Sequence, residues 1–118
     1  MKKTVQPRKQ RLRMYNTPLH ARGKRIASPL SKELREKYGK RSIPLRVGDT
    51  VVVLRGNFKG HKEKVTVIDR KAYRVYVKGV VNKKANGDDA PRPVNASNLR
   101  VVELVLDDKK REKMITRK

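Results

Sequence analysis

The residues with the clearest chemical potential form a glycine-rich, cationic stretch in the middle of the chain. Gly56 and Gly60 lie four positions apart between arginine and lysine side chains. Glycines let a backbone approach a phosphate closely, and flanking cations neutralise the phosphate charge. The stretch lacks the Gly-Lys-Ser/Thr ending of a nucleotide-binding loop, so ATP and GTP are not expected ligands. The expected RNA-binding residues are Arg55, Gly56, Asn57, Phe58, Lys59, Gly60, His61 and Lys62.

Two features of this stretch have alternative interpretations. The glycines could simply shape a hairpin, with the lysines and arginines solvated. Phe58, the only phenylalanine of the chain, could either fill a small core or stack on an unpaired base. The residue types alone do not choose between these interpretations.

A second cationic segment lies at the start of the chain. The first acidic residue is Glu33, so residues 1–32 carry only positive charge. A charge run is often a solubilising tail, but this one is interspersed with planar groups that can stack on RNA while arginines contact phosphates. The candidate RNA-binding residues of this arm are Arg8, Lys9, Arg11, Arg13, Tyr15, His20, Arg22, Lys24 and Arg25.

No arrangement of residues indicates catalysis. His20 and His61 are far apart in sequence, and the pairs Asp88-Asp89 and Asp107-Asp108 are typical of turns and helix starts. The chain has no cysteine, which excludes thiolate chemistry and zinc–cysteine sites. We therefore expect no enzyme activity, metal, cofactor or small-molecule substrate.

Composition points to a polyanionic partner. The 118 residues include 33 Lys plus Arg and 11 Asp plus Glu, for a net charge of +22. Nucleic acid and anionic lipid both fit that charge. The longest apolar run is far shorter than a membrane span, and Pro7, Pro18, Gly23 and Pro29 interrupt any long amphipathic helix. We expect no membrane partner, and the absence of cysteine fits the cytoplasm.

The pattern of apolar residues predicts a mainly β fold. Ten of the 15 valines lie between Val47 and Val81, and Ser31 and Gly39 are suited to cap a short helix over residues 31–38. Val65 and Val67 are expected on one face of the second strand, and the apolar phase shifts after Val101 as a bulge requires. The expected strands are residues 49–54, 64–68, 73–78 and 99–106.

Short strands without long intervening helices favour a small antiparallel barrel. The expected organisation has three parts: a basic arm over residues 1–41, containing the short helix; a barrel over residues 42–106; and a charged tail or helix over residues 107–118. The apolar residues of the arm before residue 28, which are Val5, Leu12, Met14, Leu19 and Ile26, are too sparse to bury a face, so this part should be mobile in isolation.

Residues 47–65 resemble the KOW motif, which occurs in some ribosomal proteins and transcription elongation factors. The flanking residues 15–20, 28–38, 84–87 and 106–111 look like the archaeal and eukaryotic form of universal large-subunit ribosomal protein twenty-four. The resemblance covers nearly the whole chain. Glu63 departs from the motif, which commonly has a third glycine there, so close approach of RNA to that position is not expected.

The resemblance implies an SH3-like barrel and a structural role in the large ribosomal subunit. It also implies early binding to the 5′ region of large-subunit ribosomal RNA, neighbouring ribosomal proteins as further partners, and a position near the polypeptide exit. Arg55, Gly56, Lys59 and Gly60 would then lie in the RNA-facing loop of the motif. The rival hypotheses are a transcription elongation factor, which would need a second globular domain, and a DNA-compacting protein, which would bind duplex through charge alone.

Overall fold

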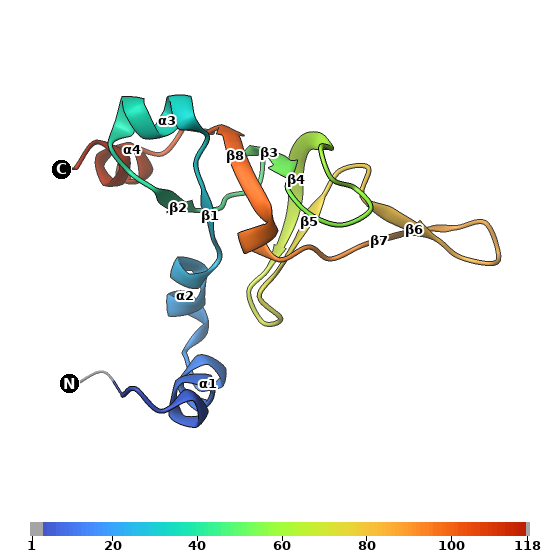
Figure 1. The fold of residues 1–118 in the computed structure, drawn as a ribbon, viewed down its shortest axis with the longest axis horizontal. Helices are drawn as coiled ribbons and strands as arrows, with labels where there is room; N and C mark the ends of the chain where they lie inside the picture. Colours follow the sequence, from blue (N-terminus) through green and yellow to red (C-terminus); the bar gives the residue numbers. More distant parts are fainter. Residues whose placement is uncertain (1–3, 118) are drawn as a thin grey trace.

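The computed structural model describes residues 4–117 (Figure 1). Residues 1–3 and 118, at the ends of the predicted arm and tail, lie outside this range. The elements are α1 (Pro7–Tyr15), α2 (Leu19–Arg22), η1 (Gly23–Arg25), β1 (Ala27–Pro29), α3 (Lys32–Tyr38), β2 (Ser42–Pro44), β3 (Thr50–Val53), β4 (Lys62–Asp69), β5 (Arg74–Val77), β6 (Val81–Lys83), β7 (Asp89–Pro91), η2 (Ala96–Asn98), β8 (Leu99–Glu103) and α4 (Lys109–Thr116).

The central sheet has the strand order β5-β4-β3-β8, and every neighbouring pair is antiparallel. Single bridges extend both edges: Val94 pairs with Val75 of β5, and Leu30 pairs with Val101 of β8. The enclosed core consists mainly of the valines that the sequence concentrates here. The structure confirms a mainly β, antiparallel, small barrel-like fold with a short helix before it and a helix after it.

Two bulges decide which valines enter the core. Thr50 pairs with Glu103 and Val51 pairs with Val101, so Val102 is the extra residue of β8, where the apolar phase shift predicted a bulge. A second shift separates Val65 from Val67 in the pairing of β4 with β5. Val65 is buried and Val67 is 54% exposed, so the prediction that both share one face is wrong.

Residues 26–45 pack directly on the barrel. Ile26 is only 2% exposed and is thus an exception to the expectation for the apolar residues before residue 28, of which Val5, Leu12 and Leu19 are exposed. β1 pairs with β2, and the buried Ser28 hydroxyl donates a hydrogen bond of 2.5 Å to Ala96 O. Helix α3 separates β1 from β2 in the sequence, so the spacing of apolar residues within either segment does not predict that the two strands pair.

Helix α3 forms where its capping residues predict it. The Ser31 hydroxyl accepts a hydrogen bond from Leu34 N, and Gly39 ends the helix with a φ of +63°. Leu34 and Tyr38 lie on one stripe and pack against the core cluster. The helix therefore covers one side of the barrel, next to α4 at the upper left of Figure 1.

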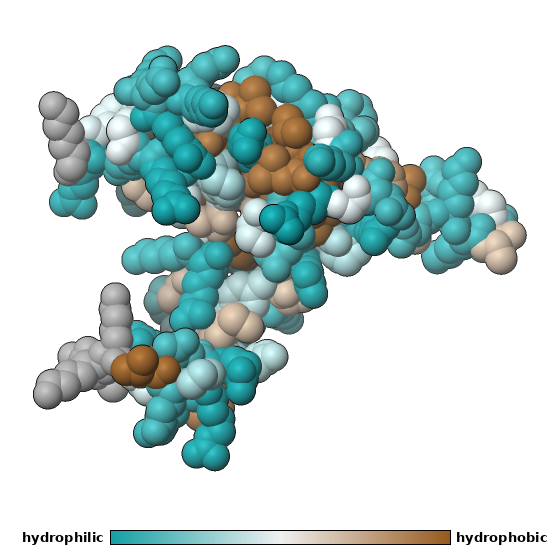
Figure 2. Space-filling view, viewed as in Figure 1, coloured by the Kyte–Doolittle hydropathy of each residue, from teal (hydrophilic) through white to brown (hydrophobic). Residues whose placement is uncertain are grey.

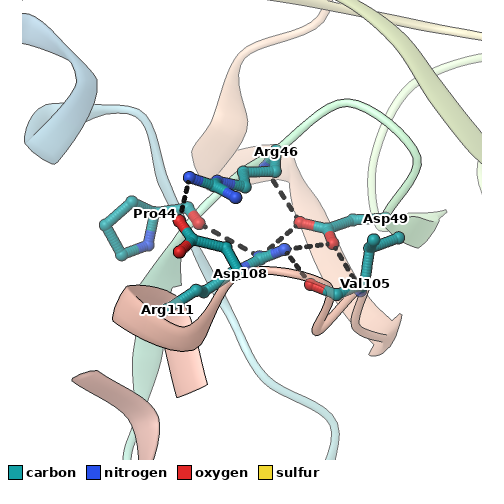
Figure 3. A network of polar contacts seen from close by, with 6 residues as sticks. All are labelled: Pro44, Arg46, Asp49, Val105, Asp108 and Arg111. Atoms are coloured by element: carbon teal, nitrogen blue, oxygen red, sulfur yellow. Dashed lines mark hydrogen bonds and ion pairs between the residues drawn. The ribbon is translucent and has the colours of Figure 1, made fainter. Parts of the chain in front are cut away.

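Helix α4 is fixed to the barrel by a buried ion pair (Figure 3). The Arg111 guanidinium lies 2.6 Å from Asp49 Oδ2 and 2.7 Å from Asp49 Oδ1, and both side chains are at most 2% exposed. Asp49 also accepts hydrogen bonds from Arg46 N and Val105 N. The carboxylate thereby joins the start of β3 to the segment that leads into α4 and to α4 itself.

The beginning of the arm forms short helices. Pro7 occupies the first turn of α1 and Pro18 precedes α2, so each proline marks the start of a short helix, of nine and four residues respectively. No residue of α1 is buried. This part of the arm extends away from the barrel at the lower left of Figure 1 and adds nothing to the core.

Candidate nucleic-acid interface

The glycine-rich loop, residues 55–61, connects β3 to β4. Gly56 and Gly60 have φ angles of +94° and +86°, which L side chains rarely adopt, so both positions favour glycine. Lys59 N donates to Gly56 O at 3.1 Å, and Gly60 N donates to Val53 O at 2.8 Å. A Cβ at either glycine would meet no heavy atom within 4 Å. The glycines thus shape the turn and also leave the backbone open to an approaching phosphate.

The predicted residues of this loop divide into free and engaged side chains. Arg55, Asn57 and Lys59 are exposed. In contrast, the His61 Nε2 atom lies 3.0 Å from Lys78 O, which fixes the ring against the neighbouring turn. Arg55 and Lys59 are therefore better placed than His61 to contact a phosphate.

Lys62 forms an ion pair with Glu103 of β8, with 3.3 Å between Nζ and Oε1. The Thr50 hydroxyl donates a hydrogen bond of 3.1 Å to the same carboxylate. That hydrogen bond, followed by those of Lys62, lowers the pKa of Glu103 from its ordinary value of 4.5. Lys62 is thus partly neutralised within the chain, and its partner is Glu103 rather than the adjacent Glu63.

A cavity of about 320 Å³ opens beside the glycine loop, and we call it the loop cavity. Phe58, on its wall, is half-buried and packs against the core, while the Arg92 guanidinium lies 5.9 Å from the centroid of its ring. Phe58 therefore packs against the core, as one of the two interpretations predicted, and it also borders the cavity. The polar residues that line the cavity are Arg55, Asn57, Arg74, Arg92, Asn95 and Asn98.

Four of these six residues, Arg74, Arg92, Asn95 and Asn98, were not among the sequence-predicted residues. They lie at least 12 positions beyond the glycine loop, and only the folding of the barrel brings them to it. A signal existed in retrospect: the segment between β7 and β8 contains a cation and two asparagines with few apolar residues. That composition is also typical of an ordinary loop, so it could not single them out.

The cations of α1 all face solvent. Arg8, Lys9, Arg11 and Arg13 are exposed, as is the Tyr15 side chain at 67%. α1 has no acidic residue in its first turn and no buried residue. Isolated helices of fewer than about 12–15 residues are marginal in water, and α1, which has nine residues, has no buried face to stabilise it.

Arg22 has a different role from the other arm cations. Its guanidinium donates to Thr17 O at 2.8 Å, Tyr15 O at 2.7 Å and Lys71 O at 3.0 Å. It also lies over the ring of Tyr73, which itself bonds to the arm backbone. Arg22 therefore connects the arm to the turn between β4 and β5 instead of presenting a free charge.

A second hollow of about 570 Å³ lies between the arm and α4. His20 and Lys24 line it from the arm, and Arg46, Arg70 and Lys110 line it from the barrel and α4. Arg46 is paired with Asp108 at 2.7 Å. Arg25 is exposed and does not line this hollow; it lies beside Arg13 instead. Cations from the arm, the barrel and α4 thus lie around the same hollow.

Figure 2 shows hydrophilic side chains over the arm and the β6–β7 hairpin, while apolar side chains gather over the centre of the body. Within residues 4–117, no cluster of three or more His, Cys, Asp or Glu could bind a metal ion. No helix in the same range has the length and apolar character needed to cross a membrane.

Comparisons with known proteins agree with this chemistry. The family model for ribosomal proteins, described as L26 in eukaryotes and L24 in archaea, matches residues 4–118. The large ribosomal subunit protein uL24 of Korarchaeum cryptofilum (strain OPF8) is 46% identical over 116 residues, which covers 98% of this chain and 88% of the relative. Both matches include the arm and α4 as well as the barrel.

Proposed function

Because this chain belongs to the archaeal and eukaryotic form of the uL24 family of large-subunit ribosomal proteins, we propose that its arm and its glycine loop bind ribosomal RNA. The chain is a structural, non-enzymatic constituent of the large ribosomal subunit in the cytoplasm, where it associates with ribosomal RNA and other ribosomal proteins. The matches extend well beyond the KOW stretch, which argues against a transcription elongation factor or a DNA-compacting protein.

The observation that carries the proposal is the complete exposure of the cations of α1. It has four exposed cations and no buried residue, so the helix gains no stability from burial in the core. A phosphate backbone supplies the missing partner, because arginines and lysines of a basic segment are neutralised and ordered as it binds. The candidate residues of the arm are therefore proposed as phosphate contacts, with Arg22 as their anchor to the barrel.

The glycine loop supplies the second contact. Its open backbone at Gly56 and Gly60 and the exposed Arg55 and Lys59 suit a phosphate that approaches from outside the barrel. The arm and loop lie on different parts of the molecule. Together they give the protein two separated contacts, which fix its orientation on a folded RNA.

We further propose that the RNA is the 5′ region of the large-subunit ribosomal RNA, that binding is early in assembly, and that the final position is near the polypeptide exit. The family resemblance supports the region and the position. The core supports early binding, because every buried apolar residue in the described part of the chain lies at or after Ile26. The core thus contains no residue of α1 or α2, and it can form before these cationic helices bind RNA.

Crosslinking within intact large subunits tests the proposal. Ultraviolet irradiation, digestion and sequencing of the RNA attached to this protein should recover fragments from the 5′ region, with crosslinked peptides from the arm and from residues 55–60. Pulse-labelling should find the protein in the earliest assembly particles. Crosslinks confined to another region of the RNA, or appearance only in late particles, would refute the corresponding part of the proposal.

A further inference from the structure

We propose that the loop cavity binds one unpaired nucleotide of the ribosomal RNA, whose base stacks on Arg92 and forms hydrogen bonds with Asn98 and Asn95. The inference rests on the proposed function and makes it more specific. Phosphate contacts position a protein on RNA without reading its sequence, whereas contacts to a base edge select the nucleotide. The loop cavity would thus give this protein a sequence-specific contact.

The size of the cavity fits a single nucleotide. Its volume of about 320 Å³ lies at the lower end of the ~300–1,000 Å³ range of small-ligand pockets. A double-stranded segment is far larger and would have to remain outside. RNA-binding proteins read sequence mainly in loops and bulges, where unstacked bases can turn outward into such a space.

Arg92 provides a planar surface at the cavity. Its guanidinium lies 5.9 Å from the centre of the Phe58 ring, and its side chain is exposed. The guanidinium lies over this ring, whose own position is fixed by packing against the core. Guanidinium planes stack on bases, and support by an aromatic ring reduces the entropy lost on stacking.

Asparagine amides provide the contacts to the base edge. Each amide offers both donors and an acceptor, which matches the mixed edges of the nucleobases. The backbone of Asn98 is occupied, since its N donates to Asn95 O and its O accepts from Leu54 N, while both asparagines line the cavity. Arg55 and Arg74, which also line it, are suited to the phosphates on either side of the base.

The walls of the cavity are fixed before any ligand enters. Val94 and Val75 exchange two backbone hydrogen bonds of 2.8 and 2.9 Å, and Arg92 N donates to Val80 O at 3.0 Å. The cavity lining contains three arginines and no acidic residue. A preformed cationic site loses little entropy on binding, which favours a specific contact.

The first test is chemical modification of unpaired bases in a 5′-region fragment of the ribosomal RNA, alone and with the full-length protein. The wild-type protein should protect one unpaired base that Asn98→Ala leaves reactive, while both proteins protect the same other bases. Asn82→Ala, at an exposed position of β6, is the matched control and should protect like the wild type. If Asn98→Ala folds poorly, Asn95→Ala at an exposed position replaces it. Identical base protection by the wild type and the folded cavity variant would overturn the inference.

The second test replaces the protected nucleotide with an abasic one. Base stacking is worth enough that the wild type should lose about five- to a hundredfold in affinity, whereas Arg92→Ala should lose much less. Arg100→Ala removes an equal charge from an exposed position outside the cavity and should behave like the wild type. Equal losses for the wild type and Arg92→Ala would overturn the inference. Failure of the wild type to bind the fragment at all would instead refute the proposed function.

Discussion

The guanidinium of Arg22 lies 5.4 Å from the centre of the Tyr73 ring, and the Tyr73 hydroxyl donates a hydrogen bond of 2.8 Å to Met14 O. Two side chains 51 positions apart thus connect the arm to the turn between β4 and β5. Arg22 completes the connection by bonding to Lys71 O. These contacts therefore attach residues 14–22 of the arm to the barrel.

The first prediction concerns that attachment. Arg22→Gln should release α1 and α2 from the barrel, because it removes a cation over an aromatic ring together with several charged hydrogen bonds. Amide exchange at residues 14–22 should accelerate while exchange in β3–β5 stays unchanged. Arg25→Gln removes the same charge from an exposed residue and serves as the control. Equal exchange in both variants would mean that the arm is not attached through Arg22.

A second prediction concerns the contribution of the arm to RNA binding. The variant to test is a deletion of residues 1–25, which ends before Ile26 because Ile26 belongs to the core. Residues 1–25 contain nine lysines and arginines, and each neutralised phosphate adds roughly 0.7–0.9 to the logarithmic salt slope. If about half of them contact phosphate, deletion should reduce the slope by roughly three to four units. Binding isotherms over a salt series measure it, and parallel slopes would mean that the arm is only a tail.

Third, Arg55→Glu with Lys59→Glu should weaken RNA binding without unfolding the barrel. Both side chains are exposed, so the unfolding free energy should change by no more than about 0.5 kcal/mol. Lys83→Glu with Lys84→Glu makes an equal charge change on the β6–β7 hairpin and is the matched control. Titration of labelled RNA, with thermal melts of each variant, provides the comparison. If the two double variants bind equally weakly, net charge rather than the glycine loop decides affinity.

The fourth prediction concerns the buried ion pair. Arg111→Met should destabilise the fold by about 3–5 kcal/mol, because Asp49 would remain as a buried carboxylate without its cation. Adding Asp49→Asn should recover part of the loss, since the unpaired charge is then removed. Lys113→Met, an exposed position on the same helix, should have little effect. Denaturant unfolding measures all three, and a loss for Arg111→Met no larger than that for Lys113→Met would contradict the prediction.

Fifth, acid should loosen the start of α4. The backbone hydrogen bond from Lys110 N, with a smaller contribution from Arg46, lowers the pKa of Asp108 from its ordinary value of 3.8. A lowered folded pKa means that the stabilisation is fully present above pH 3.8 and is lost as the pH falls through the folded value. Carbon-13 titration of the Asp108 carboxyl should give a midpoint below 3.8. A midpoint at or above 3.8 would show that the cap is absent in solution.

The sequence predicted the elements that depend on neighbouring residues. Ser31 and Gly39 mark the ends of α3, and the alternation around Val75 and Val77 predicted β5, because capping and strand period are local properties. The shift after Val101 even located the bulge of β8. Val67 was placed wrongly because the bulge in β4 depends on its pairing with β5, which the local alternation does not reveal.

What the sequence could not supply depends on contacts between distant segments. The burial of Ile26 follows from the pairing of β1 with β2, and Asp49 and Arg111 meet across 62 positions. Contacts between distant segments also form the loop cavity. The motif and the composition predicted its glycine-loop wall, whereas Arg92 and Asn98, on the opposite wall, reach it only in the folded barrel.

The separation between Asp49 and Arg111 also has a consequence for synthesis of the chain. At about 5–20 residues per second, Asp49 is made roughly 3–12 s before the arginine that pairs with it. During that interval the carboxylate is more stable in water than in an unpaired, buried position. Strands β3, β4 and β5 can already pair because they are consecutive, but the end of the barrel at Asp49 has to stay hydrated. Docking of α4 is therefore the step that buries Asp49 and removes its water.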